Sequence, residues 1–480
     1  MPEETASFYV GIFKKDGKVI GHSTASSAEL AKGTGAGKTV VRNSPVDENE
    51  HHSPFDNNMT EFLSMMRTYR NFVPLTLGIG TAIVPAMTEA MSERFLKTKG
   101  ELVEDQSNSE VEIYKLSFDH YRDYSIEQDE ILSAVQGSRH IPEVMVIGLI
   151  SSYDAFLSNI LRTIFNAHEE IIFNSERMIA FNDISRFSSI QEAKNYIIDK
   201  EVETVIRKSH HEQFKWMEGA FKTPLRSNLD VWPKFIEICE RRNLLTHTGG
   251  KISQQYIDNC KEHKCQIGNV GVGEKLHVGS QYFSESVDAV SEIGIKLCYV
   301  MWRKFSKSEQ DRADSRYNEV CFNLIENRSY GLAEELLKFG VITLSKGGSD
   351  RTRRMMIVNL ANSVRLQGKK DEAIKIIDKE DWSATGTEFQ VCSKAAKGDL
   401  DAVLALMKGI GPNDMSMDAT TYRNWPVFRE LRRDKRFSET FREVFGEDLI
   451  KNTAVIIDED NASEAVTPED NHSEEQETRH

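Results

Sequence analysis

An arginine and a histidine five positions apart are the residues of this chain best suited to chemistry. They open and close the segment Arg242-Asn243-Leu244-Leu245-Thr246-His247, which is followed by Thr-Gly-Gly. Histidine titrates near neutral pH and can transfer protons, whereas arginine stays cationic. Such a pair is suited to metal-independent cleavage of RNA, in which the 2′-hydroxyl attacks the adjacent phosphorus. We would then expect His247 to move protons and Arg242 to stabilise the pentavalent phosphorus. The products would be a 2′,3′-cyclic phosphate and a 5′-hydroxyl.

The spacing of the pair sets a geometric condition. Residues five apart on a straight α-helix point about 140° away from each other, so the two side chains cannot sit side by side. Either the helix end unwinds before Gly249, or Arg242 reaches around the helix, or a second copy of the chain supplies the partner groups. Two further residues are candidate supports: Asn243 for the phosphate or for His247, and Asp154 for orienting Arg242. The structural alternative is that both cations complement the dipole of a helix C-terminus.

The elements that would position these residues are predicted to be helices of one bundle. Apolar residues at helical spacing predict helices over about 141–164, 190–220, 229–248 and 284–305. Pro142 fits the first turn of the first helix, and Asp230 is placed to cap the third. The pair Gly249-Gly250 is a strong signal for the end of that third helix.

The motif and the order of these helices resemble the HEPN family, in which Arg-x4–6-His near the end of a bundle helix is the signature. The resemblance covers about 140–305 and is carried by SSYDAFLSNILR, EVETVIRKSHHEQFKWM and WPKFIEICERRNLLTHTGG. It implies a metal-independent endoribonuclease without cofactors, with Arg242 and His247 catalytic in a homodimer whose motifs face each other across a cleft. It also implies a bacterial toxin or phage-defence effector that stays latent until triggered. Some members carry a Tyr two residues after the His, where this chain has Gly249.

A second region, from about Gln310 to Asp448, has the pattern of short paired helices. The pairs are predicted at 315–328 with 330–342, 351–366 with 369–379, and 386–397 with 399–409. A spacing of roughly 35–40 residues predicts a tetratricopeptide-like helical-repeat domain. Such a domain would bind a protein trigger or an antitoxin. The competing function is therefore a non-catalytic helical scaffold that uses these repeats to bind a protein partner.

The whole chain is predicted to be mainly α-helical, with an irregular N-terminal arm. Its 480 residues allow several domains. A short hairpin is expected at 8–13 and 18–22 around Asp16-Gly17. The predicted segments are a flexible 1–55, a helical extension 56–139 of unassigned role, a HEPN-like bundle 140–308, repeats 309–450 and a disordered acidic tail 451–480.

The net charge of −15 does not exclude RNA as a partner. The segment Asp458–His480 has nine acids against one base and so contributes −8. The segment Arg207–Arg242 instead has eight basic against five acidic residues, which allows a locally basic surface. The six cysteines are scattered along the chain, which predicts reduced thiols rather than disulfides. The N-terminus lacks the basic region followed by an apolar region that is typical of a signal peptide. We therefore expect a cytoplasmic protein. The apolar run Phe72–Met87 is shorter than a membrane span and is interpreted as a buried or interfacial segment.

Three other motifs are interpreted as non-catalytic. The segment Cys260–Cys265 (CKEHKC), with His277 as a conceivable fourth ligand, lacks the two separated ligand pairs of a structural zinc site. We therefore expect a polar loop there and no metal. The segment 31–39 (AKGTGAGKT) does not match the spacing of a phosphate-binding loop. The pair His210-His211 is expected on a solvated helix face rather than in an active cleft.

Overall fold

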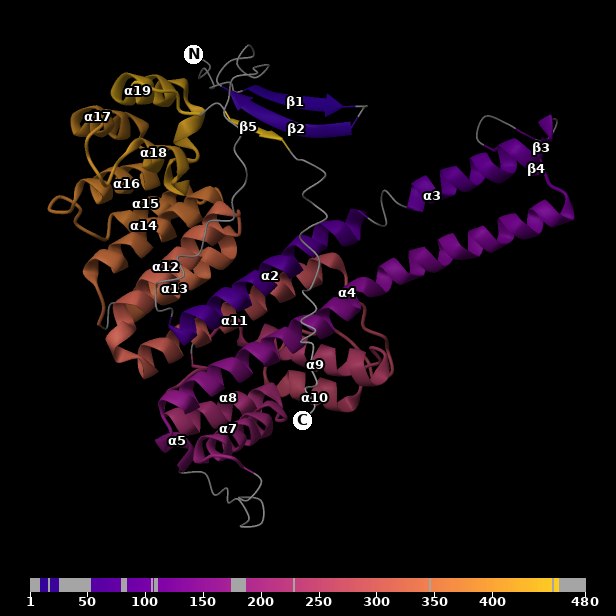
Figure 1. The fold of residues 1–480 in the computed structure, drawn as a ribbon, viewed down its shortest axis with the longest axis horizontal. Coiled ribbons are helices and arrows are strands. Elements are labelled where there is room, and N and C mark those ends of the chain that lie inside the picture. The colour runs from indigo at the N-terminus through magenta and orange to yellow at the C-terminus, as the bar shows by residue number, and fades with distance from the viewer. Residues whose placement is uncertain are drawn as a thin grey trace, which may run out of the picture. The chain divides into compact units, whose positions relative to one another are not determined.

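The computed structural model confirms that the protein is mainly α-helical (Figure 1). It describes residues 9–15, 18–25, 53–78, 84–104, 107, 111–173, 187–227, 229–344, 347–450 and 453–456. The chain forms two compact units. The bundle unit comprises 52–320 with 342–349, and the repeat unit comprises 1–51, 321–341 and 350–480. These boundaries differ from the predicted ones at 139/140 and 308/309.

The bundle unit is built around one buried helix, α11 (Ser280–Phe305), which packs against α2 (Pro54–Gly78), α4 (Phe118–Ala167) and α9 (Trp232–Thr248). The helix α2 therefore belongs to the bundle and is not part of a separate extension. Its Phe62 stacks on Phe156 with ring centroids 4.2 Å apart. A Cβ on Gly294 of α11 would overlap the Phe62 ring, so this close approach requires glycine.

The helix that carries Asp154 is longer than predicted. We expected it to begin at 141 with Pro142 in its first turn, but α4 begins at Phe118, where Ser117 caps it, and Pro142 lies inside the helix. The additional N-terminal part packs on a small neighbouring cluster and leaves apolar residues such as Phe118, Ile126 and Leu132 exposed, so its apolar positions do not mark one buried face. That cluster has Met91, Phe95 and Ile131 at its core.

The residues of this cluster belong to an antiparallel arm. It consists of α3 (Val84–Met91), the π-helix η2 (Ser92–Lys97), β3 (Glu101–Leu102), β4 (Tyr114–Lys115) and the start of α4 (Figure 1). Within the part of the chain that the structure describes, α4 alone is long and apolar enough to span a membrane, a property that buried core helices share. In the run Phe72–Met87, which we expected to be buried or interfacial, both end residues are exposed.

The single helix predicted over 190–220 is two helices. The first is α7 (Ile190–Ile206) and the second is α8 (His210–Phe221). Ser209 interrupts them because it forms a capping box with Glu212, in which each side chain bonds the backbone N–H of the other residue. The break determines where α8 starts, and therefore where its first two histidines point.

The third predicted helix, α9, ends as expected but begins differently. Its cap is Val231 rather than Asp230, and no side chain caps the first turn, in which Pro233 lies. The helix ends at Gly249, which has a left-handed φ of 60° that favours glycine. The short helix α10 (Gln254–Glu262) follows, with Ser253 as its N-cap, and α5 (Glu170–Phe173) precedes α7.

The repeat region contains the predicted helix pairs. They are α12 (Gln310–Glu326) with α13 (Tyr330–Leu344), α14 (Asp350–Leu366) with α15 (Lys370–Ile377), and α16 (Thr387–Lys397) with α17 (Leu400–Ile410). The helices α18 (Ala419–Asn424) and α19 (Lys435–Phe445) follow. Their kinship with tetratricopeptide repeats stays a prediction.

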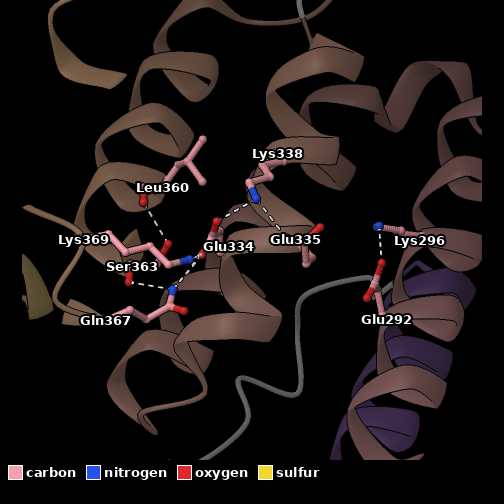
Figure 2. A network of polar contacts seen from close by, with 9 residues as sticks. All are labelled: Glu292, Lys296, Glu334, Glu335, Lys338, Leu360, Ser363, Gln367 and Lys369. Carbon is pink, nitrogen blue, oxygen red and sulfur yellow. Dashed lines mark hydrogen bonds and ion pairs between the residues drawn. The ribbon is translucent and has the colours of Figure 1, made fainter. Parts of the chain in front are cut away.

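A buried glutamate joins two consecutive helix pairs (Figure 2). Glu334 of α13 is 4% exposed and accepts hydrogen bonds from Gln367 at 2.7 Å and Lys369 at 3.0 Å, both in the turn between α14 and α15. Lys338 adds an ion pair at 2.6 Å. Three donors therefore compensate the desolvation of this carboxylate.

A small antiparallel sheet completes the repeat unit. The expected hairpin is confirmed as β1 (Tyr9–Lys15) and β2 (Lys18–Ala25), and β5 (Thr453–Ile456) adds a third strand beside β2. The prediction of a disordered tail from 451 is therefore wrong for β5. The glycine-rich segment 31–39 and the acidic residues from 458 lie outside the described residues.

Candidate active site

One carboxylate connects three helices at the centre of the candidate site. Asp154 Oδ1 of α4 accepts a hydrogen bond from His210 Nε2 of α8 at 2.9 Å. Its Oδ2 accepts one from Arg242 Nη2 of α9 at 3.2 Å. The structure thus brings two of the predicted site residues, Asp154 and Arg242, into contact and adds His210 to them.

His210 lies in the protein interior. It is 6% exposed, and its ring lies against Tyr153 and Phe235, with ring centroids 6.1 and 5.6 Å away. Our prediction of a solvated surface position is therefore wrong for this residue. The capping box at Ser209 explains the difference, because it starts α8 at His210 and directs this first side chain toward α4.

Two groups beside Asp154 are held in their protonated forms. Burial raises the pKa of the Tyr153 phenol well above its usual value, and the charges near it add to this effect. Burial and the negative charge of Asp154 likewise raise the pKa of the Cys239 thiol. The thiol is therefore not a nucleophile at neutral pH, since the thiolate is the reactive form.

Arg242 is positioned by Asp154 without being fully engaged. Its side chain is 22% exposed, and its buried Nε has no hydrogen-bond partner among the residues that the structure describes. A guanidinium has five N–H groups, and the bond to Asp154 uses one of them. Asp154 therefore fixes a cation that can still bind an anion.

The other two predicted site residues lie on the same helix but outside this contact. His247 is exposed in the last turn of α9, and Asn243 is half-buried. The helix continues to Thr248, so it does not unwind between Arg242 and His247. In the described part of the chain no hydrogen bond or ion pair joins these two residues. Of the three arrangements left open by the sequence, helix unwinding is excluded.

The neighbouring arginine has a different, structural environment. Arg241 pairs with the buried Glu237 at 2.8 Å and lies over the Tyr282 ring, 4.0 Å from its centroid. Glu237 also accepts hydrogen bonds from the Tyr256 and Tyr282 hydroxyls, at 2.8 and 2.6 Å. Of the two consecutive arginines, only Arg242 faces the candidate site.

A cavity of about 490 Å³ opens beside this network, and its lining includes His210 and Cys239. His211, the next residue of α8, lines it together with Glu262 and His263 from the end of α10. Burial, His263 and Arg226 lower the pKa of His211, in that order of size. The neutral imidazole, which has one ring nitrogen that can accept a hydrogen bond or bind a metal, is therefore favoured at neutral pH.

The cysteines of the CKEHKC segment do not join that cluster. Cys260 is buried and its thiol is hydrogen-bonded to that of Cys265. This bond and burial raise the pKa of Cys260, whereas the same bond lowers the pKa of Cys265. The two thiols pair with each other, and His263 lies with His211 instead.

No family model, curated protein or solved structure matches this chain. The kinship with HEPN ribonucleases therefore stays a prediction from the residues. The residue that the sequence analysis misjudged is His210. Its signal was the Ser209-x-x-Glu212 pattern, which marks a helix start and so separates the two histidines from the helix before them.

Proposed function

We propose that this protein is a metal-independent endoribonuclease of HEPN type. His247 is the general acid or base, and Arg242 stabilises the pentavalent phosphorus formed when a 2′-hydroxyl attacks its own phosphodiester. Asp154 is a positioning residue for Arg242, and Asn243 supports the phosphate. In the same proposal the enzyme is a cytoplasmic homodimer, and the repeat unit binds the protein that triggers or restrains it.

The observation that carries this proposal is the state of Arg242. A helix-dipole role would need only an exposed cation near the end of α9. Arg242 is instead drawn into the bundle by an ion pair at 3.2 Å, with most of its N–H groups uncommitted to that pair. Fixing a cation in this way prepares it for a charge that develops during a reaction.

The test is cleavage of total RNA by the purified full chain in excess EDTA. Wild type is expected to cut, and His247→Ala to cut at least about 100-fold more slowly. His277→Ala is the matched control, since His277 is also exposed, at 77%, and has no proposed role. Toxicity on expression, seen with wild type and absent with His247→Ala, covers the case in which the purified enzyme needs a trigger. Equal cleavage by wild type and His247→Ala would refute the proposal.

The chemistry of the RNA ends tests the mechanism separately. Attack by the 2′-hydroxyl leaves a 5′-hydroxyl, which a polynucleotide kinase labels without prior phosphatase treatment. An oligonucleotide with a single 2′-deoxy nucleotide at the cut position is expected to resist cleavage there. Cleavage at that nucleotide, or 5′-phosphate ends, would indicate attack by water and a different nuclease mechanism.

A further inference from the structure

Two histidines and a glutamate from different helices converge on the wall of the cavity. His211 comes from the first turn of α8, whereas Glu262 and His263 end α10. The two imidazole rings are 4.4 Å apart between centroids. One nitrogen of each ring and one carboxylate oxygen of Glu262 all lie within 4.8 Å of one another.

The backbone at the end of α10 makes this convergence possible. Consecutive residues inside an α-helix point about 100° apart, which would separate Glu262 from His263. His263 is the C-cap, with φ −93° and ψ 9°, and its backbone has left the regular helix. The turn is closed by the Cys265 N–H, which donates to the Cys260 carbonyl at 2.8 Å.

We propose that His211, Glu262 and His263 bind a divalent first-row transition metal, for which Zn²⁺ is the test ion, and that this metal ties α8 to α10. Two imidazoles and one carboxylate are a common ligand set for Zn²⁺. Because all three residues line the cavity, the fourth coordination position would be open to water. The site does not depend on the proposed ribonuclease function.

The distances are compatible with binding after a small closure. Ligand atoms about 2.1 Å from a tetrahedral metal are roughly 3.4 Å from each other. Starting from separations of up to 4.8 Å, the three residues must approach by about 1.4 Å at most. Glu262 is exposed at a helix end, so a rotamer change can provide this movement.

Arg226 competes with the metal for His211. Its Nη1 donates to His211 Nδ1 at 3.0 Å, while its Nε and Nη2 hold Glu218 at 3.0 and 2.6 Å. This bond must break whichever ring nitrogen binds the metal. If Nδ1 binds it, the metal occupies the lone pair that accepts from Arg226. If Nε2 binds it, Nδ1 of the neutral ring carries the proton and cannot accept a hydrogen bond. The bonds to Glu218 keep Arg226 in place after the bond to His211 is lost.

The experiment is titration of the untagged full chain, dialysed against a chelator, with ZnCl₂ by calorimetry and with Co²⁺ by visible absorption. Wild type is expected to bind one metal. His211→Ala and His263→Ala should each weaken binding by about 100-fold or more. Mutating a residue that only hydrogen-bonds a metal ligand already lowers metal affinity by about 10–100-fold, and these variants lose a ligand itself. Arg226→Gln should bind about tenfold more tightly, because it removes a competing cation near the metal. His277→Ala, the matched control, should bind as wild type does.

Several results would overturn the proposal. They are no saturable binding by wild type, wild-type affinity in both His211→Ala and His263→Ala, or unchanged affinity in Arg226→Gln. A thiolate-to-Co²⁺ charge-transfer band would place the metal on Cys260 and Cys265 instead. Circular dichroism melting of each metal-free variant shows whether it is folded. If a histidine variant is misfolded, Glu262→Gln, which alters an exposed side chain, takes its place as the variant that lacks a ligand. Weaker binding is expected for it, and wild-type affinity would refute the site.

Discussion

The sharpest prediction concerns two inactive variants that restore activity when combined. Arg242 and His247 lie on one uninterrupted helix, where five residues correspond to a rotation of about 140° and a rise of about 7.5 Å. Arg242 is also bound to Asp154 and so does not reach around the helix. If the proposed function holds, we therefore expect a complete site to combine His247 from one subunit with Arg242 from the other.

The magnitude follows from the symmetry of a dimer. Arg242→Ala and His247→Ala homodimers have no complete site. In an equal mixture, about half of the dimers contain one subunit of each kind, and each of these has one intact site of two. The mixture is expected to reach about one quarter of wild-type activity. A site contained within one chain would give no recovery.

The assay is cleavage of a fluorescent RNA after the two variants are co-expressed with different tags or unfolded and refolded together. A matched control mixes wild type with the double variant Arg242→Ala/His247→Ala. Sites shared between subunits leave such mixed dimers inactive, so this mixture should show about one quarter of the activity. Sites within one chain would give about one half.

The reasoning is refuted if the mixed single variants stay inactive while tag pull-down shows that mixed dimers have formed. It is also refuted if the wild type remains a monomer during cleavage, as measured by light scattering. In either case Arg242 and His247 would not share a site between subunits, although cleavage in EDTA would still test the ribonuclease function by itself.

Three further predictions concern stability. Asp154→Asn removes the negative charge that holds Arg242 and replaces one of the two oxygens that accept from His210 and Arg242. It should lower the free energy of unfolding by about 1–3 kcal/mol in a urea titration. Asp199→Asn, which alters the exposed ion pair with Arg162, should change it by less than about 0.5 kcal/mol. Ser209→Ala removes the capping box of α8 and should cost about 1 kcal/mol, and Ser209→Gly only a few tenths, so equal losses would contradict the cap's role. Burial raises the pKa of Glu334, but the hydrogen bonds from Lys338, Lys369 and Gln367 outweigh it, so the pKa is lowered on folding. Its contribution is fully present above the unfolded pKa of about 4.3 and is lost as the pH falls through the lower, folded pKa. Glu334→Gln should therefore destabilise the protein at pH 7, and its free energy of unfolding should converge with that of wild type only below the folded pKa.

The sequence predicted those elements whose signals are local. Gly249 ends α9 because glycine adopts the left-handed backbone conformation without a steric penalty. This signal does not depend on tertiary structure. The helix pairs from α12 to α17 were likewise predicted, since each has its own apolar period and a short turn. The contact between Asp154 and Arg242 was also anticipated, because a carboxylate beside the apolar stripe of α4 needs a cation.

The features that were missed depend on partners distant in the sequence. The start of α4 packs against α3, and β5 pairs with β2 across more than 400 positions, so neither could be found from a local window. The inclusion of α2 in the bundle depends on Phe62 meeting Phe156 and Gly294. The environment of His210 depends on Asp154, which no local pattern connects to it.

The first turn of α8 shows how one local choice places two different groups. Consecutive residues on a helix point about 100° apart, so starting α8 at His210 sends that side chain to Asp154 and the next one, His211, to the cavity. A helix that continued unbroken from α7 would not have this start, and the capping box of Ser209 with Glu212 is what provides it. Because His210 shares its carboxylate with Arg242, the position of Arg242 depends on where α8 begins. The cap is therefore a structural determinant of the proposed active site, although none of its atoms belongs to it.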